Sequence, residues 1–257
     1  MTRFRVRPNA GAHTHVGLLR TNNEDNYFMN ERNGLFLVAD GMGGHAFGEL
    51  ASRTAIQVIE DAVSHAFRDE EKRRDIACLK HTVENSIRCA NQAIYRLNRD
   101  RGFPDGTGMG TAISGLLIAP GYDFAIIFHI GDCRVYRYRD GILERLTTDH
   151  SLYQAWIESG RQGVAPRRNL ILRVIGPYPE VTADLQEANV RSGDAFLLCS
   201  DGLTDMISDS EIDNILSMNE GVPPDGICQQ LVSQANRRGG MDNVTVVLVR
   251  LRDTEEF

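Results

Sequence analysis

Residues 111–146 read TAISGLLIAPGYDFAIIFHIGDCRVYRYRDGILERL, and apolar segments alternate in this stretch with short turns. Four of these segments have the length and composition of strands, at residues 111–119, 124–130, 134–139 and 142–146. The last turn between them, Asp140-Gly141, is a strong hairpin signal. Consecutive strands with short turns pair antiparallel, because a parallel pair needs a long crossover. The middle of the chain therefore predicts an antiparallel sheet.

Helices and further strands are expected on either side of this sheet. Apolar residues recur at helical spacing at residues 47–67, 76–98, 209–218 and 224–238. Five more segments predict strands, at residues 13–20, 25–30, 35–39, 195–200 and 244–251. Between these two sets, residues 149–179 form a polar stretch rich in arginine and glycine. Strands in meanders and helices in blocks predict an α+β fold with stacked sheets and the helices outside. No repeat or linker divides the sequence, so we expect residues 1–257 to form a single domain.

Charge and composition exclude several classes of function. The chain has 28 Lys and Arg against 35 Asp and Glu, a formal net charge of −7. This acidic balance argues against binding to nucleic acid or to an anionic membrane, because both need a broad basic surface. No glycine loop ends in Gly-Lys-Ser/Thr, which excludes a P-loop nucleotide site, and no apolar stretch approaches the roughly 20 residues of a membrane helix. Five scattered cysteines without a CxxC pair indicate reduced thiols, so we expect a cytoplasmic protein.

Acidic residues stand at the ends of apolar strands. The four aspartates in this position are Asp40, Asp132, Asp201 and Asp242. Any single one of them is readily explained as a turn or helix-capping residue. Four at once indicate a cluster of hard oxygen ligands, which suits Mg²⁺ or Mn²⁺. Zinc is the weaker candidate, because the seven histidines show no HxxxH or HExxH spacing.

Seven motifs in fixed order cover nearly the whole chain. They are RTNNED at 20–25, VADGMGGH at 38–45, GMGTA at 108–112, GDCR at 131–134, LTTDH at 146–150, LLCSDGL at 197–203 and DNVT at 242–245. Together they resemble the metal-dependent serine/threonine protein phosphatases, the PPM or type-2C class, in their bacterial form. The resemblance implies a four-layer α-β-β-α sandwich, in which two stacked antiparallel sheets are flanked by helices.

The resemblance also implies a site for Mn²⁺ or Mg²⁺, with two core ions and a weaker third. Asp40 would bridge the core ions, and the carbonyl of Gly41 would bind the first of them. Asp201 and Asp242 would hold the second ion, while Asp132 would share the third with Asp201. A metal-activated water would then attack phosphorus in line.

Four further residues are expected around these ions. Arg20 would clamp the phosphoryl group, because its planar fork can hold two oxygens at once. The alternative for Arg20 is a surface ion pair with Glu24 or Asp25. Glu24, Asp25 and Asn243 would contact metal-bound water or support the ligands.

The loop after Asp40 departs from some relatives. Those relatives carry a histidine directly after the Asp-Gly pair, proposed as the general acid, whereas this chain has Met42, which donates no proton. Whether His45, a metal-bound water or no group replaces it stays open. Residues 151–179 correspond to the family's flap beside the site. Its arginines either read acidic or phosphorylated substrate surfaces or are simply solvated; they are Arg161, Arg167, Arg168 and Arg173.

We therefore expect a phosphatase that hydrolyses phosphoserine and phosphothreonine in proteins and counters a serine/threonine protein kinase. Its partners would be phosphorylated proteins, among them that kinase and its substrates, and we expect a monomer that binds neither nucleic acid nor membrane. A two-metal phosphodiesterase or nuclease is the enzymatic alternative, against which the acidic charge counts. A phosphoprotein-binding pseudo-phosphatase is the other alternative, but it would be expected to lose metal aspartates, and all four are present.

Overall fold

The computed structural model describes residues 6–44, 46–69, 75–119 and 123–253. Its strands are β1 (Val6–His15), β2 (Asn26–Asn30), β3 (Leu35–Met42), β4 (Gly110–Ile118), β5 (Phe124–Ile130), β6 (Arg134–Arg139), β7 (Ile142–Arg145), β8 (Asp184–Asn189), β9 (Ala195–Cys199) and β10 (Val244–Asp253). Its helices are α1 (Ala46–Phe67), α2 (Ile76–Asp100), α3 (Leu152–Glu158), α4 (Asp201–Thr204), α5 (Asp209–Met218) and α6 (Pro224–Arg237). Within these ranges, no helix combines the length and the apolar character that crossing a membrane requires.

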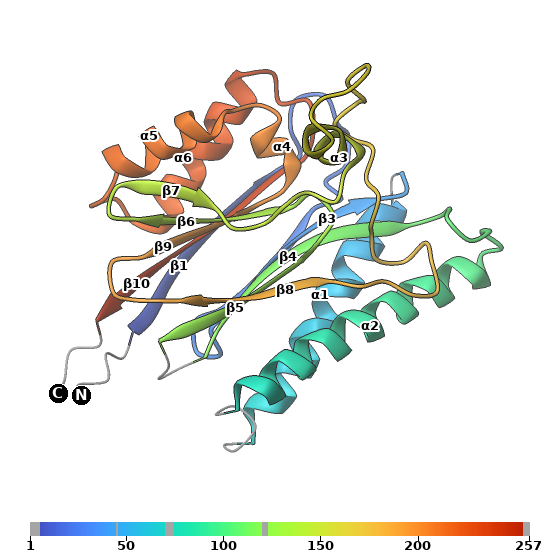
Figure 1. The fold of residues 1–257 in the computed structure, drawn as a ribbon, viewed down its shortest axis with the longest axis horizontal. Helices are drawn as coiled ribbons and strands as arrows, with labels where there is room; N and C mark the ends of the chain where they lie inside the picture. Colours follow the sequence, from blue (N-terminus) through green and yellow to red (C-terminus); the bar gives the residue numbers. More distant parts are fainter. Residues whose placement is uncertain (1–5, 45, 70–74, 120–122, 254–257) are drawn as a thin grey trace.

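The strands form two antiparallel sheets that pack face to face (Figure 1). One sheet has the order β1-β10-β9-β6-β7, and the other has the order β2-β3-β4-β5-β8. Helices α5 and α6 cover the outer face of the first sheet, and α1 and α2 cover the outer face of the second (Figure 1). This arrangement confirms the predicted α+β fold with an α-β-β-α sandwich.

Strand β3 shows how the sequence builds these layers. Successive side chains of a strand point to opposite faces of its sheet. Leu35 and Leu37 accordingly pack in the apolar cluster with α1 and α2, while Phe36 and Val38 pack in the cluster between the two sheets. Because both faces of β3 are buried, its sequence is a continuous apolar run rather than an alternating one.

The strand predicted at residues 13–20 is wrong in its bounds. Strand β1 runs over Val6–His15, where it pairs antiparallel with β10. The chain then turns at Gly17, which has a φ of +83°. A Cβ atom at this position would lie 2.2 Å from the backbone oxygen of Asp242, so only glycine fits. Residues 16–20 are thus a loop that packs against the loop before β10. The other predicted helices and strands overlap the observed ones.

Two elements, β8 and α3, have weak sequence signals. Strand β8 lies at the edge of its sheet and exposes most of its side chains, so it lacks the apolar pattern that predicts strands. Helix α3 lies inside the polar stretch 149–179 and buries none of its residues. Its start is fixed locally, because the Ser151 side chain accepts a hydrogen bond from the Gln154 N–H at 3.1 Å.

A glycine in the middle of β4 makes room for an aromatic ring. Gly115 pairs with Phe128 across the sheet, and a Cβ on Gly115 would lie 2.1 Å from Phe128 Cζ. We expect Gly115→Ala to destabilise the protein by about 1–3 kcal/mol, because the buried ring must shift. Gly221→Ala is the matched control, since no heavy atom lies within 4 Å of the added methyl group. Thermal unfolding of both variants measures the difference, and equal melting temperatures would contradict the packing described here.

Candidate metal centre

Strand ends from both sheets bring acidic side chains together at one end of the seam between the sheets. Asp40 lies near the end of β3, and Asp132 lies in the turn between β5 and β6. Asp201 is the first residue of α4, directly after β9, and Asp242 precedes β10. Asp25 belongs to the loop before β2. The structure therefore places the four predicted aspartates in one cluster, in which Asp40 interacts electrostatically with Asp25, Asp132 and Asp201.

Burial and mutual repulsion disfavour negative charge on this cluster. Burial, followed by the neighbouring carboxylates, raises the pKa of both Asp40 and Asp201 well above the usual range, and the two carboxyl groups share a hydrogen bond. Burial likewise raises the pKa of Asp132 to about 7 and that of Asp25 to about 6. Hydrogen bonds lower the pKa of Asp25 in part, since the Ser200 hydroxyl donates to its Oδ2 at 2.7 Å.

Several carboxylate oxygens of this cluster are buried without a hydrogen-bond partner. They are the Oδ1 atoms of Asp25, Asp132 and Asp201. Burying a polar atom without a partner costs free energy, so a positively charged ligand at these oxygens would stabilise the fold. Hard oxygen donors without sulfur or imidazole match Mg²⁺ or Mn²⁺ rather than zinc. The residues present thus fit the divalent cations that the sequence predicts.

Gly41 is held where its carbonyl can lie beside Asp40. A Cβ at this position would lie 2.1 Å from the backbone oxygen of Gly48 and 2.6 Å from that of Glu24. The start of α1 and the loop before β2 therefore approach the end of β3 more closely than any side chain permits. The hydroxyl of Thr111 donates to the carbonyl of Asp40 at 2.8 Å and fixes the same strand end from β4.

Arg20 lies at the rim of the cluster and pairs with one of its members. Its Nη2 donates to Asp242 Oδ2 at 2.7 Å, with the two side chains 53% and 38% exposed. The ion-pair partners considered from the sequence were Glu24 and Asp25, whereas the partner in the structure is Asp242. The hydrogen bond to Asp242 raises the pKa of Arg20 above its ordinary value, with smaller contributions from Glu24 and Asp40.

Asn243 organises the loop that carries Glu24. Its side-chain oxygen accepts the Glu24 N–H at 2.8 Å, and its amide nitrogen donates to the carbonyls of Val16 and Asn22 at 2.9 and 2.8 Å. The backbone N–H of Asn243 donates to Asp242 Oδ1 at 2.8 Å. Asn243 therefore ties the loop of Arg20 and Glu24 to Asp242, at the start of β10. The carboxylate of Glu24 lies over Gly48, where an added Cβ would come within 1.8 Å of Oε2.

Two further aspartates lie beside the cluster. Asp205 follows Asp201 by one helical turn and lines a small pocket together with Asp132 and Asp149. Burial raises the pKa of Asp205, whereas Arg168 opposes that rise. Asp149 is neutralised by Arg134, whose Nε and Nη2 donate to both of its carboxylate oxygens at 2.9 and 2.7 Å. Neither aspartate is among the site residues predicted from the sequence. The spacing of four residues between Asp201 and Asp205 in DGLTD, which places both on one helix face, could have indicated Asp205, and Asp149 lies in the LTTDH motif.

Residues of the stretch 151–179 line the same pocket. Arg168 lies over the Tyr153 ring at 4.8 Å and 3.9 Å from Asp205, and both Arg168 and Tyr153 line the pocket. Arg161 and Arg167 are exposed to solvent, and Arg173 donates to Asp184 at 2.7 Å. The stretch is anchored to the body of the fold by bridges such as Thr111 to Ile175.

Two residues of the glycine loop bear on the question of the general acid, and the structure describes one of them. Met42 is the last residue of β3, is partly buried and pairs with Gly110. His45 lies outside the described residues.

Comparison with known proteins agrees with the motifs. The family model of protein phosphatase 2C matches residues 12–223. Protein phosphatase PhpP of Streptococcus pneumoniae is 34% identical over 250 residues, which cover 94% of this chain and 97% of that protein. Serine/threonine protein phosphatase PstP of Mycobacterium tuberculosis is 38% identical over 243 residues, or 92% of this chain. The chain spans 44% of the length of PstP.

The solved structures include a relative with bound metal. The catalytic domain of PstP in complex with two manganese ions has a TM-score of 0.81 against this structure at 35% identity, covering 96% of this chain and 100% of that one. The family match extends over most of the residues that build the two sheets and the acidic cluster. The resemblance drawn from the seven motifs is confirmed, and the chain belongs to the protein phosphatase 2C family.

Proposed function

We propose that this protein hydrolyses phosphoserine and phosphothreonine in proteins, with Mn²⁺ or Mg²⁺ bound at the acidic cluster. The observation that carries the proposal is the set of buried, unpartnered carboxylate oxygens on Asp25, Asp132 and Asp201. The names of the relatives support it, because PhpP and PstP are both phosphatases and the PstP catalytic domain binds two manganese ions.

The cluster offers ligands for two core ions and a weaker third. We assign Asp40, the carbonyl of Gly41, Asp201 and Asp242 to the core ions, and Asp132 with Asp201 to the third. Asp25 and Glu24 support these ligands from the loop before β2. When bound, two such ions provide Lewis acidity toward an anionic phosphoryl group and lower the pKa of water. With its carboxylates alone the cluster repels a phosphate dianion, so the ions also reverse the sign of the local field.

Arg20 holds the phosphoryl group in this proposal. A guanidinium has five N–H donors in a fixed plane, and the bond from Nη2 to Asp242 sets the direction of that plane. Arg20 thus links a core-ion ligand to the substrate and orients the phosphoryl oxygens toward the cluster. Its half-exposed position at the rim matches a group that a protein-borne phosphate must reach from solvent.

The remaining parts of the proposal concern partners and location. The substrates would be phosphorylated proteins, and the opposing enzyme would be a serine/threonine protein kinase. Residues 151–179 would act as a flap beside the substrate, with Arg161 and Arg167 facing the solvent from which a phosphoprotein approaches. All five cysteines are free, which supports a reducing, cytoplasmic environment. We also propose that the protein acts as a monomer.

Hydrolysis assays with matched substrates test the reaction. Peptides carrying phosphoserine, phosphothreonine or phosphotyrosine are compared with an aryl phosphate monoester and an aryl phosphate diester, each in Mn²⁺, Mg²⁺ or excess chelator. We expect release of phosphate from the phosphoserine and phosphothreonine peptides that requires the metal. Preferential hydrolysis of the diester would favour a phosphodiesterase, and no hydrolysis of any substrate despite metal binding would favour a pseudo-phosphatase.

Replacing Asp40 separates the metal role from a structural one. Asp40→Asn keeps the shape of the side chain and removes a charge that two cations share, so turnover should fall by several orders of magnitude. In excess chelator the same variant should melt at a higher temperature than the wild type, because one buried, repelling carboxylate is gone. Asp61→Asn, on the exposed side of α1, is the control and should change neither quantity. Loss of both activity and stability would indicate misfolding instead.

Arg20 variants test the phosphoryl clamp. Arg20→Ala should cost on the order of 2–4 kcal/mol in kcat/KM, and Arg20→Lys should recover only part of this, because a point charge cannot reproduce the planar fork. Arg53→Ala removes another exposed arginine that pairs with a carboxylate, Glu49, and should leave kcat/KM unchanged. Wild-type kinetics for Arg20→Ala on both peptide and aryl phosphate would reduce Arg20 to a surface ion-pair partner.

The raised pKa values predict how pH affects stability in excess chelator. Asp132, with a pKa raised to about 7, and Asp40 and Asp201, whose pKa values burial raises well above the usual range, bind their protons more tightly in the folded state than in the unfolded state. The stability that protonation provides is present at low pH and is lost as pH rises from the unfolded value of about 3.9 through the folded pKa. Each such group contributes a slope of about 1.4 kcal/mol per pH unit where only the folded state is protonated.

The pH range of the measurement must avoid the range in which buried histidines add stability as pH rises. Burial lowers the pKa of His129 to about 4 and also lowers that of His150, so both residues add stability as pH rises toward the unfolded value of about 6.5. We therefore expect the melting temperature in chelator to fall between about pH 6.5 and 8, and saturating Mn²⁺ to abolish the fall. The variant Asp132→Asn should show a shallower fall. A melting temperature that rises with pH over this range in chelator would contradict the assignment.

A further inference from the structure

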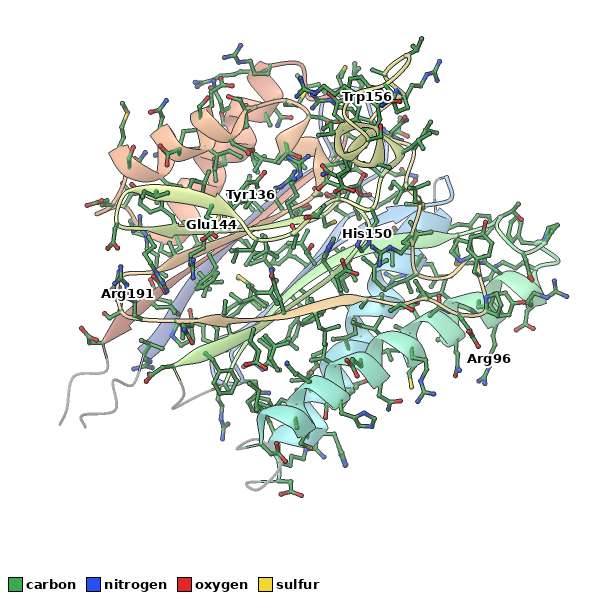
Figure 2. The ribbon with its side chains drawn as sticks, viewed as in Figure 1. Arg96, Tyr136, Glu144, His150, Trp156 and Arg191 are labelled. Atoms are coloured by element: carbon green, nitrogen blue, oxygen red, sulfur yellow. The ribbon has the colours of Figure 1, made fainter. Side chains whose placement is uncertain are left out.

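Two histidines and an aspartate form a second cluster next to the turn that carries Asp132. His129 and His150 are 3% and 5% exposed, and their rings stack with centroids 4.2 Å apart. Together with Asp184 they offer three ligand-type atoms within 4.8 Å of one another. His150 precedes α3 and lies below Trp156 of that helix in the view of Figure 2. The mechanism proposed above uses none of these three side chains.

The hydrogen bonds of His150 argue against a second metal site here. Its Nδ1 accepts the backbone N–H of Gly131 at 3.1 Å, so the proton of the neutral ring lies on Nε2. That Nε2 lies 3.2 Å from Asp184 Oδ2, a charge contact that does not have the geometry of a hydrogen bond. A metal ligand needs a free lone pair on Nε2, with the proton on Nδ1 donated to an acceptor. The backbone at Gly131 imposes the opposite tautomer.

The same contacts clamp the turn that carries Asp132. Gly131 and His150 are joined twice: the Gly131 N–H donates to the His150 imidazole, and the backbone N–H of His150 donates to the Gly131 carbonyl at 2.8 Å. Gly131 has a φ of +99°, and a Cβ there would lie 2.4 Å from the Cβ of Ala112. On the other side of Asp132, the Ser114 hydroxyl donates to the Cys133 carbonyl at 2.6 Å. The backbone is thus fixed on both sides of a carboxylate whose Oδ1 has no partner.

The imidazole of His150 is itself held in place. It packs between the His129 ring and the turn, and Asp184 fixes its outer edge, with Arg173 donating to the second oxygen of Asp184 at 2.7 Å. Burial lowers the pKa of both histidines, so the rings are neutral near pH 7. A neutral ring keeps Nδ1 as an acceptor, whereas a protonated one would lose the bond to Gly131.

We propose that His150 is a positioning residue whose Nδ1, by accepting the Gly131 N–H, aims the Asp132 carboxylate at the weak third cation. The proposal rests on the function proposed above, because it presupposes that Asp132 binds a cation. Groups that orient a metal ligand without touching the metal typically change affinity by roughly 10–100-fold when they are removed. The effect should be confined to the weakest ion, because His150 holds the turn of Asp132, whereas Thr111 holds Asp40 and Arg20 and Asn243 hold Asp242.

Two amide variants isolate the Nδ1 acceptor. Asparagine places its side-chain oxygen where Nδ1 lies in histidine, whereas glutamine places its amide group near Nε2. His150→Asn therefore keeps an acceptor for the Gly131 N–H, and His150→Gln loses it. Both variants remove the stacked ring, so the comparison between them cancels the loss of packing. Asp132→Ala supplies the reference in which the weak ion is absent, and melting temperatures in chelator check that each variant folds.

Calorimetric titration with Mn²⁺ measures the affinity of each class of ion. We expect His150→Gln to weaken the weakest Mn²⁺ site by roughly tenfold or more while the core ions bind as in the wild type, and His150→Asn to restore most of the lost affinity. The Mn²⁺ concentration that half-saturates phosphopeptide hydrolysis should shift in parallel.

The outcomes separate this proposal from the one it rests on. The wild type should show a weak Mn²⁺ binding phase that Asp132→Ala removes. If it does not, the assignment of a third ion to Asp132 is wrong, and so is the role of His150. If that phase is present but His150→Gln binds it like the wild type, the role of His150 alone is wrong. Equal losses in the Asn and Gln variants would show that the ring, and not its Nδ1 acceptor, supports the site.

Discussion

Mutual repulsion among buried carboxylates is the constraint on which the rest of this structure depends. Asp40 and Asp201 lie close enough to share a hydrogen bond, and Asp132 and Asp25 are within electrostatic reach. An uncompensated buried charge costs several kcal/mol, which is comparable with the whole stability of a typical domain. In the proposed function, bound divalent cations would offset this repulsion. The fold would then have to hold the carboxylates in place until the ions bind, with few other groups neutralising them.

Two kinds of support meet that requirement. Three apolar clusters, one between the sheets and one under each pair of helices, fix the strands from which the ligands extend. Backbone-directed side chains then fix the strand ends: Thr111 holds the carbonyl of Asp40, and Asn243 holds the loop of Glu24. Because these bonds engage main-chain groups, they leave the carboxylate oxygens available. Some bonds do engage the carboxylates directly: Arg20 and the Asn243 N–H donate to Asp242, and the Ser200 hydroxyl donates to Asp25.

The sequence predicts the elements that bury apolar side chains and misses those that do not. Strand β3 was predictable because both of its faces are buried, whereas the edge strand β8 is mostly polar and the short helix α3 buries none of its apolar residues. The aspartates at strand ends were visible as a pattern, and the family motifs gave them an order. Contacts between distant segments left no such trace. Arg20 and Asp242 are 222 positions apart, and Gly131 and His150 meet only because the chain returns after β7.

The cluster is also asymmetric in how its carboxylates are supported. Asp40 lies within β3, whose ladder bonds to β4 continue on both sides of it, and Asp201 begins a helix directly after β9. Asp132 lies in a turn with a left-handed glycine before it, so its position depends on the bonds that His150 and Ser114 make to its neighbours. A ladder resists displacement cooperatively, whereas a turn held by two side chains yields when either is lost. The ligand with the least regular backbone is thus the one assigned to the weakest ion. Asp132 also lines the small pocket that Tyr153 and Arg168 line, which the proposed function makes the place of substrate approach.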